Sequence, residues 1–256
     1  VAFASGAESA LPFHLLPDFG ACFEDQTGRN PGGWAYVSNS EVKNGGGGVG
    51  VIMFNANGDV EHYEKLLEGT SRNCGGGVTS WNTFISCEES MNTHCHELDP
   101  FGGLVSEDES RTALGGLEGG NFESFASDER GKHHRVPNYY VTEDRSKGPL
   151  RRFRPTLGSN NLSSEADPTI LDWTNPYRKM LFGNATIDYL VLEPTDDEAR
   201  QGTFYWTTDK EEAKNSASFT ILMLRESTSR MESCTSRRDG TRMYLSLIST
   251  MPTIPG

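Results

Sequence analysis

The sequence predicts an all-β protein and, within that class, a β-propeller. Helical periodicity is almost absent from its 256 residues, whereas short apolar stretches recur between turns rich in Gly, Asn and Asp. Many short antiparallel strands joined by such turns are typical of all-β chains. A loosely repeated phrase, a strand ending in an acidic or amide residue with Pro or Ala nearby, favours propeller blades, although a sandwich also has hairpins with Gly turns. The phrase occurs at 53–58, 96–102 and 190–194.

The expected strands follow one another along most of the chain. They cover residues 33–38, 48–54, 83–86, 95–98, 139–142, 150–153, 187–192 and 203–206. Asn57-Gly58 after the second strand is a strong hairpin signal. The four glycines at 45–48 predict a tight or mobile turn, and the Ser/Asn-rich stretch 158–168 predicts a loop. Helix is expected only at 196–200 and 210–214, each a turn or two long.

Length, composition and charge exclude several classes of function. The chain can bury a substantial core as one large domain or two small ones. It has no apolar run long enough for a membrane span. A net charge of −13 argues against nucleic acid as a partner, because phosphate backbones require clustered Lys and Arg, and the one dense basic run is 151–154. An acidic, Gly-rich chain suits cations better. The start of the chain, residues 1–6, shows no signal-peptide pattern, so we expect none within this sequence.

One segment stands out as a candidate for chemistry, residues 71–89. Cys74 precedes three glycines, and the strand that follows ends in adjacent carboxylates, Glu88 and Glu89. Adjacent residues of a strand face opposite ways, so only one of these acids is expected to face a site. A thiolate with carboxylates suits a metal of mixed character such as iron. The alternative is a glycine turn with solvated acids and a Cys74–Cys87 disulfide across a hairpin. The five cysteines contain no C-x-x-C pair, which argues against a zinc knuckle or a thioredoxin-type motif.

The same segment resembles the signature of the PhoX-type alkaline phosphatases, an N-C-x-G-G-x-T-P-W-x-T-x-x-x-C-E-E run, with Ser80 where the family has Pro. The resemblance covers roughly residues 11–218. Further matching segments are 37–41, similar to N-H-E but with Ser40 for His, and 119–126, similar to K-H-E-A but lacking its His beside Glu123. Others are 141–144, similar to T-E-D, 150–153 and 202–206.

The resemblance implies a secreted, extracellular or periplasmic β-propeller that hydrolyses phosphate monoesters with an iron–calcium cofactor. By position it makes metal ligands of Glu41, Cys74, Glu89 and Glu123, and of Glu143 or Asp144 as a further calcium ligand. Hard calcium prefers carboxylate oxygen and a thiolate prefers iron, so the donor set is chemically coherent. The two missing histidines favour a second hypothesis, a non-catalytic calcium-binding propeller that serves as an extracellular binding or structural module.

A smaller candidate lies at His94-Cys95-His96. His94 and His96 are two apart on an expected strand and therefore face one side, so with Cys95 they could form a metal clip. Partly exposed edge residues are the plainer interpretation.

The last part of the chain differs from the rest. We expect a partial propeller domain at 1–218 and an atypical tail at 219–256, which has no Lys, Asn, Val, Ala, His, Gln or Trp but four of the seven Met. If the third base of each codon is joined to the first two bases of the next codon, the new reading frame permits a Y-x-P-N-A-E-G-I-D-V-K-D-G-K-L-Y-F run. This run resembles the family's next segment. The tail is therefore interpreted as out-of-frame translation, with a genuine divergent tail as the alternative. A propeller without its closing strands would be open, poorly stable and inactive.

Overall fold

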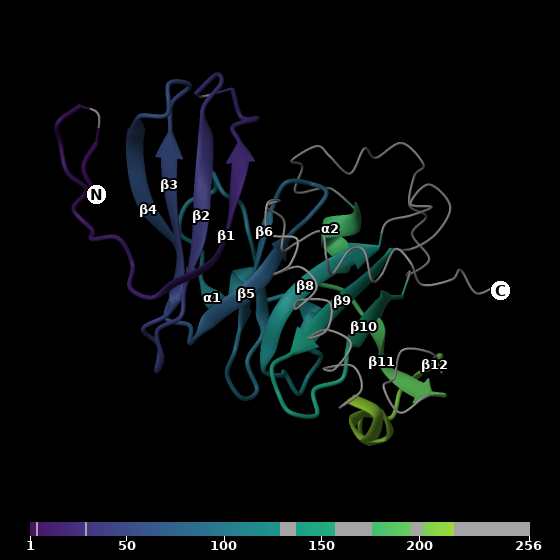
Figure 1. Cartoon of the computed structure of the whole chain (residues 1–256). Helices are drawn as coiled ribbons and strands as arrows, with labels where there is room; N and C mark the ends of the chain where they lie inside the picture. Colours follow the sequence, from purple (N-terminus) through teal and green to yellow (C-terminus); the bar gives the residue numbers. More distant parts are fainter. Residues whose placement is uncertain (4, 29, 129–136, 157–175, 196–201, 218–256) are drawn as a thin grey trace.

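Three antiparallel sheets follow one another along the chain in a β-propeller-like arrangement, as a computed structural model shows (Figure 1). The structure describes all residues except 4, 29, 129–136, 157–175, 196–201 and 218–256. The first sheet holds β1 (Pro17–Glu24), β2 (Trp34–Ser40), β3 (Gly48–Phe54) and β4 (Val60–Glu68). The second holds β5 (Asn73–Val78), β6 (Phe84–Glu88) and β7 (Cys95–Leu98). The third holds β8 (Phe122–Asp128), β9 (Asn138–Glu143), β10 (Arg151–Pro155), β11 (Ala185–Pro194) and β12 (Gly202–Thr207).

Of the two expected helices, 210–214 is observed and 196–200 lies outside the described residues. The helices that the structure describes are all short. They are α1 (Glu107–Ser110), the 3-10 turn Ala113–Gly115 and α2 (Pro176–Met180), with residues 210–217 also helical. Ser106 caps α1 and shares a capping box with Glu109, which explains why so short a helix begins there. No helix among the described residues is both long enough and apolar enough to cross a membrane.

The all-β prediction is confirmed, and each of the eight expected strands lies on an observed one. β1, β4, β5 and β8 were not expected. β5 has the sequence NCGGGV, whose glycines lower strand propensity, and β4 is interrupted by charged residues. The turn between β3 and β4 spans 55–59, with Gly58 at φ 86°, so the Asn57-Gly58 signal marks a longer connection than a two-residue hairpin.

Each sheet begins with a hairpin whose first strand is bulged near its start. The register shifts lie between Pro17 and Gly20 in β1, between Asn73 and Gly76 in β5, and between Phe122 and Phe125 in β8. Because the hairpins are antiparallel, the start of the first strand lies beside the end of the second. β5 packs against both β1 and β8, so the three bulged ends meet.

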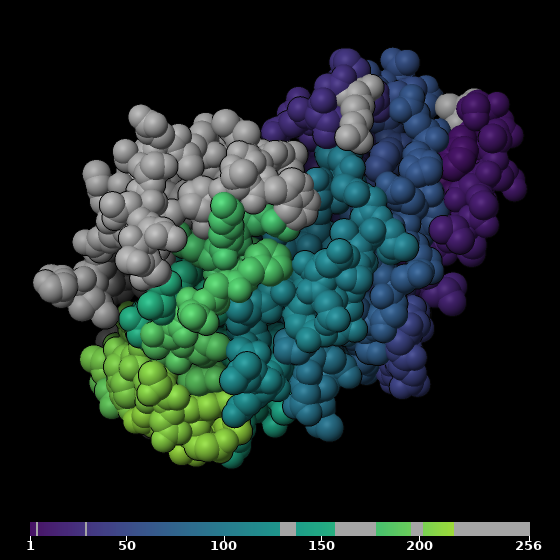
Figure 2. All heavy atoms as spheres, turned by 180° about the vertical axis from the view of Figure 1, so that it is seen from behind, coloured from purple at the N-terminus to yellow at the C-terminus, as the bar shows by residue number. Residues whose placement is uncertain are grey.

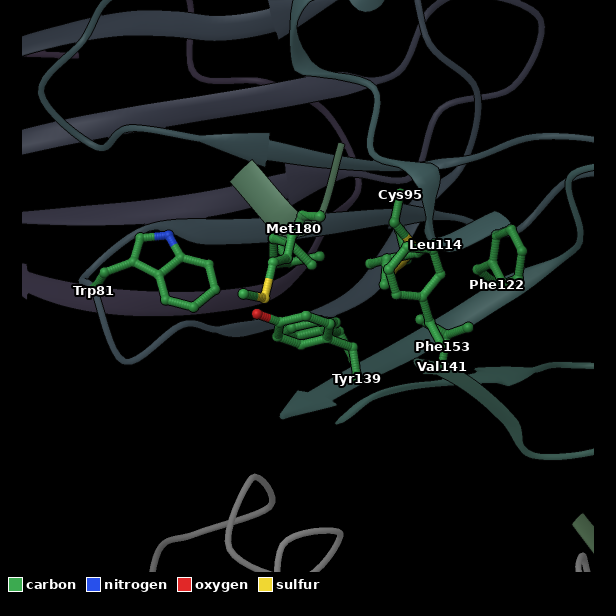
Figure 3. Close-up of a cluster of buried hydrophobic side chains, with 12 residues drawn as sticks. Trp81, Cys95, Leu114, Phe122, Tyr139, Val141, Phe153 and Met180 are labelled. Atoms are coloured by element: carbon green, nitrogen blue, oxygen red, sulfur yellow. A yellow bond between two sulfur atoms is a disulfide. The ribbon is translucent and has the colours of Figure 1, made fainter. Parts of the chain in front are cut away.

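The sheets are joined by buried side chains. One cluster lies between the second and third sheets and includes Trp81, Tyr139 and Met180 (Figure 3). The other joins the first sheet to β6, where Phe84 packs against Phe19 and Phe23. In the space-filling view the described residues form one continuous body, with the first sheet at one end and residues 210–217 at the other (Figure 2).

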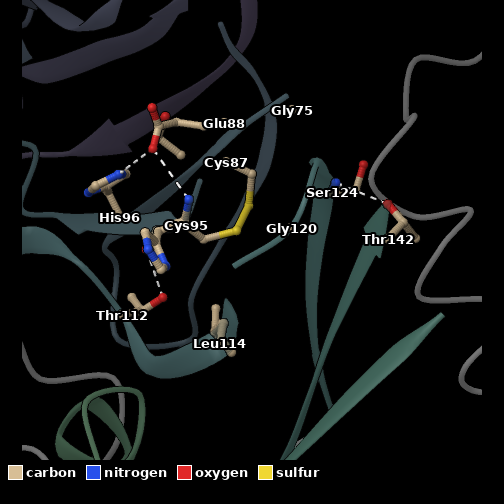
Figure 4. Close-up of a disulfide and its surroundings, with 12 residues drawn as sticks. Gly75, Cys87, Glu88, Cys95, His96, Thr112, Leu114, Gly120, Ser124 and Thr142 are labelled. Atoms are coloured by element: carbon tan, nitrogen blue, oxygen red, sulfur yellow. Dashed lines mark hydrogen bonds and ion pairs between the residues drawn. A yellow bond between two sulfur atoms is a disulfide. The ribbon is translucent and has the colours of Figure 1, made fainter. Parts of the chain in front are cut away.

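A disulfide links Cys87 and Cys95, which lie opposite each other in β6 and β7 (Figure 4). Cys74 is free, so the alternative Cys74–Cys87 disulfide does not form. The His94-Cys95-His96 clip is also excluded, because Cys95 is in the disulfide and buried His96 bonds to Glu88 and Ser110. The tail at 219–256 lies outside the described residues.

Candidate metal centre

Six donor residues gather where the three bulged hairpin ends meet, and each sheet supplies two of them. One donor of each pair lies in the bulge of the first strand: Asp18 in β1, Cys74 in β5 and Glu123 in β8. The other follows directly after the second strand: Glu41 after β2, Glu89 after β6 and Asp144 after β9. The same local geometry therefore occurs three times around one centre, which we call the acidic cluster.

Cys74 lies at the middle of the acidic cluster. Its thiol donates to Asp18 Oδ2 at 3.0 Å and to Glu123 Oε1 at 3.6 Å. The possible ligand atoms of Asp18, Glu41 and Cys74 all lie within 4.8 Å of one another. The same holds for those of Cys74, Glu89 and Glu123. The remaining acid, Asp144, lies close enough to Glu89 to raise the pKa of that carboxyl.

The backbone is arranged to let Cys74 approach the third sheet. A Cβ atom on Gly75 would lie 1.7 Å from the carbonyl oxygen of Glu123, so only glycine permits this contact. Asn39 of β2, which is fully buried, donates from Nδ2 to the carbonyl oxygens of Cys74 at 2.6 Å and Gly75 at 2.8 Å. The first and third sheets thus hold the chain on both sides of Cys74.

The electrostatics of the acidic cluster favour positive charge. Burial raises the pKa of Cys74, and the neighbouring Asp18 and Glu123 raise it further. Burial also raises the pKa of Glu123, which feels the charges of Asp144, Asp18 and Glu41 as well. The pKa of Glu89 is raised to about 7 by burial and by the neighbouring carboxyl of Asp144, against the opposing effect of Arg72. Protons are therefore retained on groups that a cation would otherwise neutralise.

The predicted ligands separate into two groups. Glu41, Cys74, Glu89, Glu123 and Asp144 come together, although they are far apart in the sequence. Glu143 is not brought to them. Its buried Oε1 accepts hydrogen bonds from Arg151 at 2.9 Å and Lys210 at 2.8 Å, because Glu143 pairs in register with Phe122 and so faces the opposite side from Asp144.

Glu88 likewise faces away from Glu89. Its carboxylate accepts a hydrogen bond from His96 (Figure 4). It also accepts one from the backbone nitrogen of Ser71, and these contacts lower the pKa of Glu88 despite its burial. This agrees with the expectation that only one of the two adjacent acids faces the site.

Asp18 and Asn39 were missed as site residues. Asp18 occupies the bulge position that Cys74 and Glu123 occupy in the other sheets, and nothing in its local sequence marks it, because a bulge is defined by pairing with another strand. Asn39 lies in a segment that resembles the family. Its hydrogen bonds to Cys74 and Gly75, which lie 35 and 36 positions further along the chain, could not be predicted from the sequence.

The residues present fit the iron–calcium donor set. They offer carboxylate oxygens, which calcium prefers, and one free thiol, which a softer metal prefers. Among the described residues, the only ion pair made by a member of the acidic cluster is that of Glu89 with Arg72, so most of the negative charge has no protein cation to balance it.

Comparisons with known proteins agree with the resemblance. Residues 28–143 match the sequence model of the family "Alkaline phosphatase PhoX". A solved structure of Pseudomonas fluorescens PhoX in complex with vanadate, a transition state analogue, is similar in fold, with a TM-score of 0.50 and 15% sequence identity. The alignment covers 82% of this chain and 54% of that chain, so this chain spans about half the length of the similar structure. No curated protein matches.

Proposed function

We propose that the acidic cluster binds calcium and iron and that the chain belongs to a metal-dependent phosphomonoesterase of the PhoX type. The match of residues 28–143 to the PhoX family supports phosphatase activity in general terms. The observation that carries the metal assignment is the meeting of three bulge residues and three strand-end residues from three separate sheets. Acids brought together in this way repel one another, so their convergence costs stability unless a cation binds.

The residues of the acidic cluster would divide into ligands for iron and ligands for calcium. Cys74, as a thiolate, would hold iron, with Glu89 and Glu123 beside it. Asp18 and Glu41, which also lie close to Cys74, and Asp144 would supply oxygen ligands for calcium. We leave Glu143 out of the ligand set because Arg151 and Lys210 occupy its carboxylate. When bound, the cations would neutralise phosphoryl oxygens and supply an oxygen nucleophile.

The two missing histidines do not argue against this function. Ser40 is buried and donates its hydroxyl to the carbonyl oxygen of Leu15, and Phe122 is fully buried in the core. Ser40 directly precedes Glu41 in the sequence, and Phe122 directly precedes Glu123. Because neighbouring residues of a strand alternate in direction, Ser40 and Phe122 face away from the acidic cluster. Their replacement leaves the donors of the acidic cluster intact.

An extracellular or periplasmic location is part of the proposal. Disulfides persist mainly in oxidising compartments, and the Cys87–Cys95 disulfide suits such a location. The phosphate monoester is proposed as the small-molecule partner.

The first experiment measures metal content and hydrolysis in the same samples. Protein stripped with chelator is dialysed against calcium and ferrous or ferric iron, its bound metal is measured by mass spectrometry, and hydrolysis of p-nitrophenyl phosphate is followed. We expect metal uptake and metal-dependent hydrolysis, both lost in Cys74→Ser. Cys22→Ser is the matched control, because Cys22 is also a free cysteine but is not part of the acidic cluster.

The outcomes separate the two hypotheses. Calcium uptake without hydrolysis would favour the non-catalytic binding module. Equal metal content in Cys74→Ser and in the unmodified chain would contradict the role of Cys74, and no cation uptake by the unmodified chain would contradict the metal site itself.

A further inference from the structure

We propose that Arg72 is the residue that binds the phosphoryl oxygens of the substrate beside the acidic cluster. This inference rests on the proposed function and adds to it a specific substrate-binding side chain.

The main chain places Arg72 between the first two sheets. Its amide donates to the carbonyl oxygen of Val42 at 2.8 Å, and its carbonyl oxygen accepts from the amide of Glu89 at 2.8 Å. Val42 and Glu89 lie next to, or within, the strand ends that form the acidic cluster, and Cys74 follows two residues later. Arg72 is thus fixed at the rim of the cluster by its backbone and not only by its charge.

The backbone of Arg72 is in an unfavourable conformation. Its φ is 53°, in the left-handed region that a long side chain seldom occupies. Such conformations persist where surrounding contacts hold them, and they concentrate at functional sites. Here the two backbone hydrogen bonds hold the conformation, and the result is a cation at the edge of an otherwise negative centre.

The guanidinium group has hydrogen-bonding capacity left over. Nη1 donates to the carbonyl oxygen of Glu89 at 3.3 Å, while the carboxylate Oε2 of Glu89 is 3.9 Å away, too far for a hydrogen bond. Among the described residues, neither Nε nor Nη2 of Arg72 has an acceptor, and Nε is shielded from solvent. Nη2 is therefore the nitrogen left free for an acceptor that arrives with a ligand.

Phosphate is the ligand that best matches this group. The outer edge of a guanidinium, formed by Nη1 and Nη2, presents two parallel donors that fit two oxygens of one phosphoryl group. The side chain is 33% exposed, so a ligand can reach it. Carboxylates of the acidic cluster would repel an anion, and Arg72 together with bound cations would offset that repulsion.

The simpler interpretation is that Arg72 only balances the charge of Glu89. The two interpretations differ for Arg72→Lys, which keeps the positive charge but loses the two parallel donors. The two interpretations also differ for Arg72→Gln. This variant removes a positive charge that would repel a bound metal cation, so calcium affinity should not fall. Substrate binding predicts that this variant binds phosphate more weakly and calcium at least as tightly.

The test measures binding of calcium and of inorganic phosphate by isothermal titration calorimetry, with metal content checked in each sample. The matched control is Arg111→Lys. Arg111 is 38% exposed, is paired with Glu107 and Asp108 on α1, and also has a shielded Nε without a partner, but it is not near the acidic cluster. We expect Arg72→Lys to weaken phosphate binding about tenfold with unchanged calcium affinity, because the bidentate geometry is lost, and Arg111→Lys to change neither.

Each outcome bears on one proposal. Phosphate affinity in Arg72→Lys equal to that of the unmodified, metal-loaded chain would overturn the role of Arg72 and leave the metal site standing. Parallel loss of calcium and phosphate binding in Arg72→Gln would indicate a structural role and also overturn it. Failure of the unmodified chain to bind calcium or iron would contradict the proposed function, and the absence of phosphate binding by that chain would contradict Arg72 as well. If p-nitrophenyl phosphate is hydrolysed, Arg72→Lys should raise KM more than it lowers kcat.

Discussion

Two pairs of adjacent acids, Glu88-Glu89 and Glu143-Asp144, show how the same residue type is used for opposite purposes one position apart. The first member of each pair faces the interior and has a basic partner: His96 for Glu88, and Arg151 with Lys210 for Glu143. The second member faces the acidic cluster, where the only protein cation paired with it is Arg72 on Glu89, within the described residues. Because adjacent residues of a strand face opposite sides, one acid of each pair is used to stabilise the interior and the next is left available to a ligand.

The interior acids stabilise the fold only as part of pairs. Removing one partner leaves a buried charge unbalanced, which is strongly unfavourable. The cluster acids have the reverse property, because each of them raises the free energy of the folded chain until a cation binds.

The largest effect is expected for Arg151→Ala. Arg151 is 1% exposed, pairs with Glu143, donates to the carbonyl oxygen of Gly115 and stacks over Phe122. Loss of one partner of a buried ion pair costs about 3–5 kcal/mol. Urea unfolding measures it. Arg111→Ala, at the surface, should cost about 0.5 kcal/mol or less, and similar losses in the two variants would mean that the Glu143 pair does not stabilise the interior.

Cation binding should stabilise the chain through the acidic cluster alone. At free calcium about 100-fold above the dissociation constant, the free energy of unfolding should rise by about 2.7 kcal/mol, and chelator should reverse the rise. Thermal unfolding with and without calcium measures this change. Glu123→Gln should reduce the calcium-dependent part, whereas a full calcium response in that variant would show that calcium binds elsewhere.

The Cys87–Cys95 disulfide belongs to the interior side of the contrast. Its two residues are eight apart, so the closed loop is short, and the double variant Cys87→Ala/Cys95→Ala should lose about 2.5 kcal/mol. Because Cys74 is not in the disulfide, calcium uptake at low temperature should be unaffected. Loss of calcium binding in the folded double variant would indicate that the disulfide positions Glu89.

The most direct comparison is Glu88→Gln against Glu89→Gln in chelated protein. Glu88 accepts hydrogen bonds from Ser71 and His96, and hydrogen bonds to a charged group contribute about 1.5–3 kcal/mol, so Glu88→Gln should lose about 2 kcal/mol. Glu89→Gln removes repulsion from Asp144 and Glu123 and should change stability by about 0.5 kcal/mol or less. Equal losses from the two variants would show that Glu88 and Glu89 contribute to stability in the same way.

Much of the strand content could be predicted from the sequence, because apolar runs bounded by Gly, Asn and Asp report on local structure. The stretch 48–54 coincides with β3 and 95–98 with β7. β5 could not be found this way, because its glycines serve the close approach to Glu123, a tertiary contact. The partner of Cys87 also depends on strand register, which places Cys95 opposite it and leaves Cys74 free.

The site could be predicted only in part, for a related reason. The resemblance identified Glu41, Cys74, Glu89 and Glu123 through motifs, and the strand alternation narrowed Glu88 and Glu89 to one acid. The resemblance did not distinguish Glu143 from Asp144 as the further ligand, because the direction of each side chain depends on which of them pairs with Phe122. Asp18 and Asn39 act through contacts with distant residues and have no local signature.

Because each sheet supplies one bulge residue and one strand-end residue, no sheet alone holds a complete set of donors. Under the proposed function, a cation would bind with full affinity only after all three sheets have docked, which would place its contribution late in folding. Interactions that form after the transition state slow unfolding and leave the folding rate nearly unchanged. In stopped-flow measurements, calcium should lower the unfolding limb of the chevron while the folding limb stays in place. A metal bound where the three bulged hairpin ends meet would then slow unfolding of the chain, although the fold would assemble without the metal.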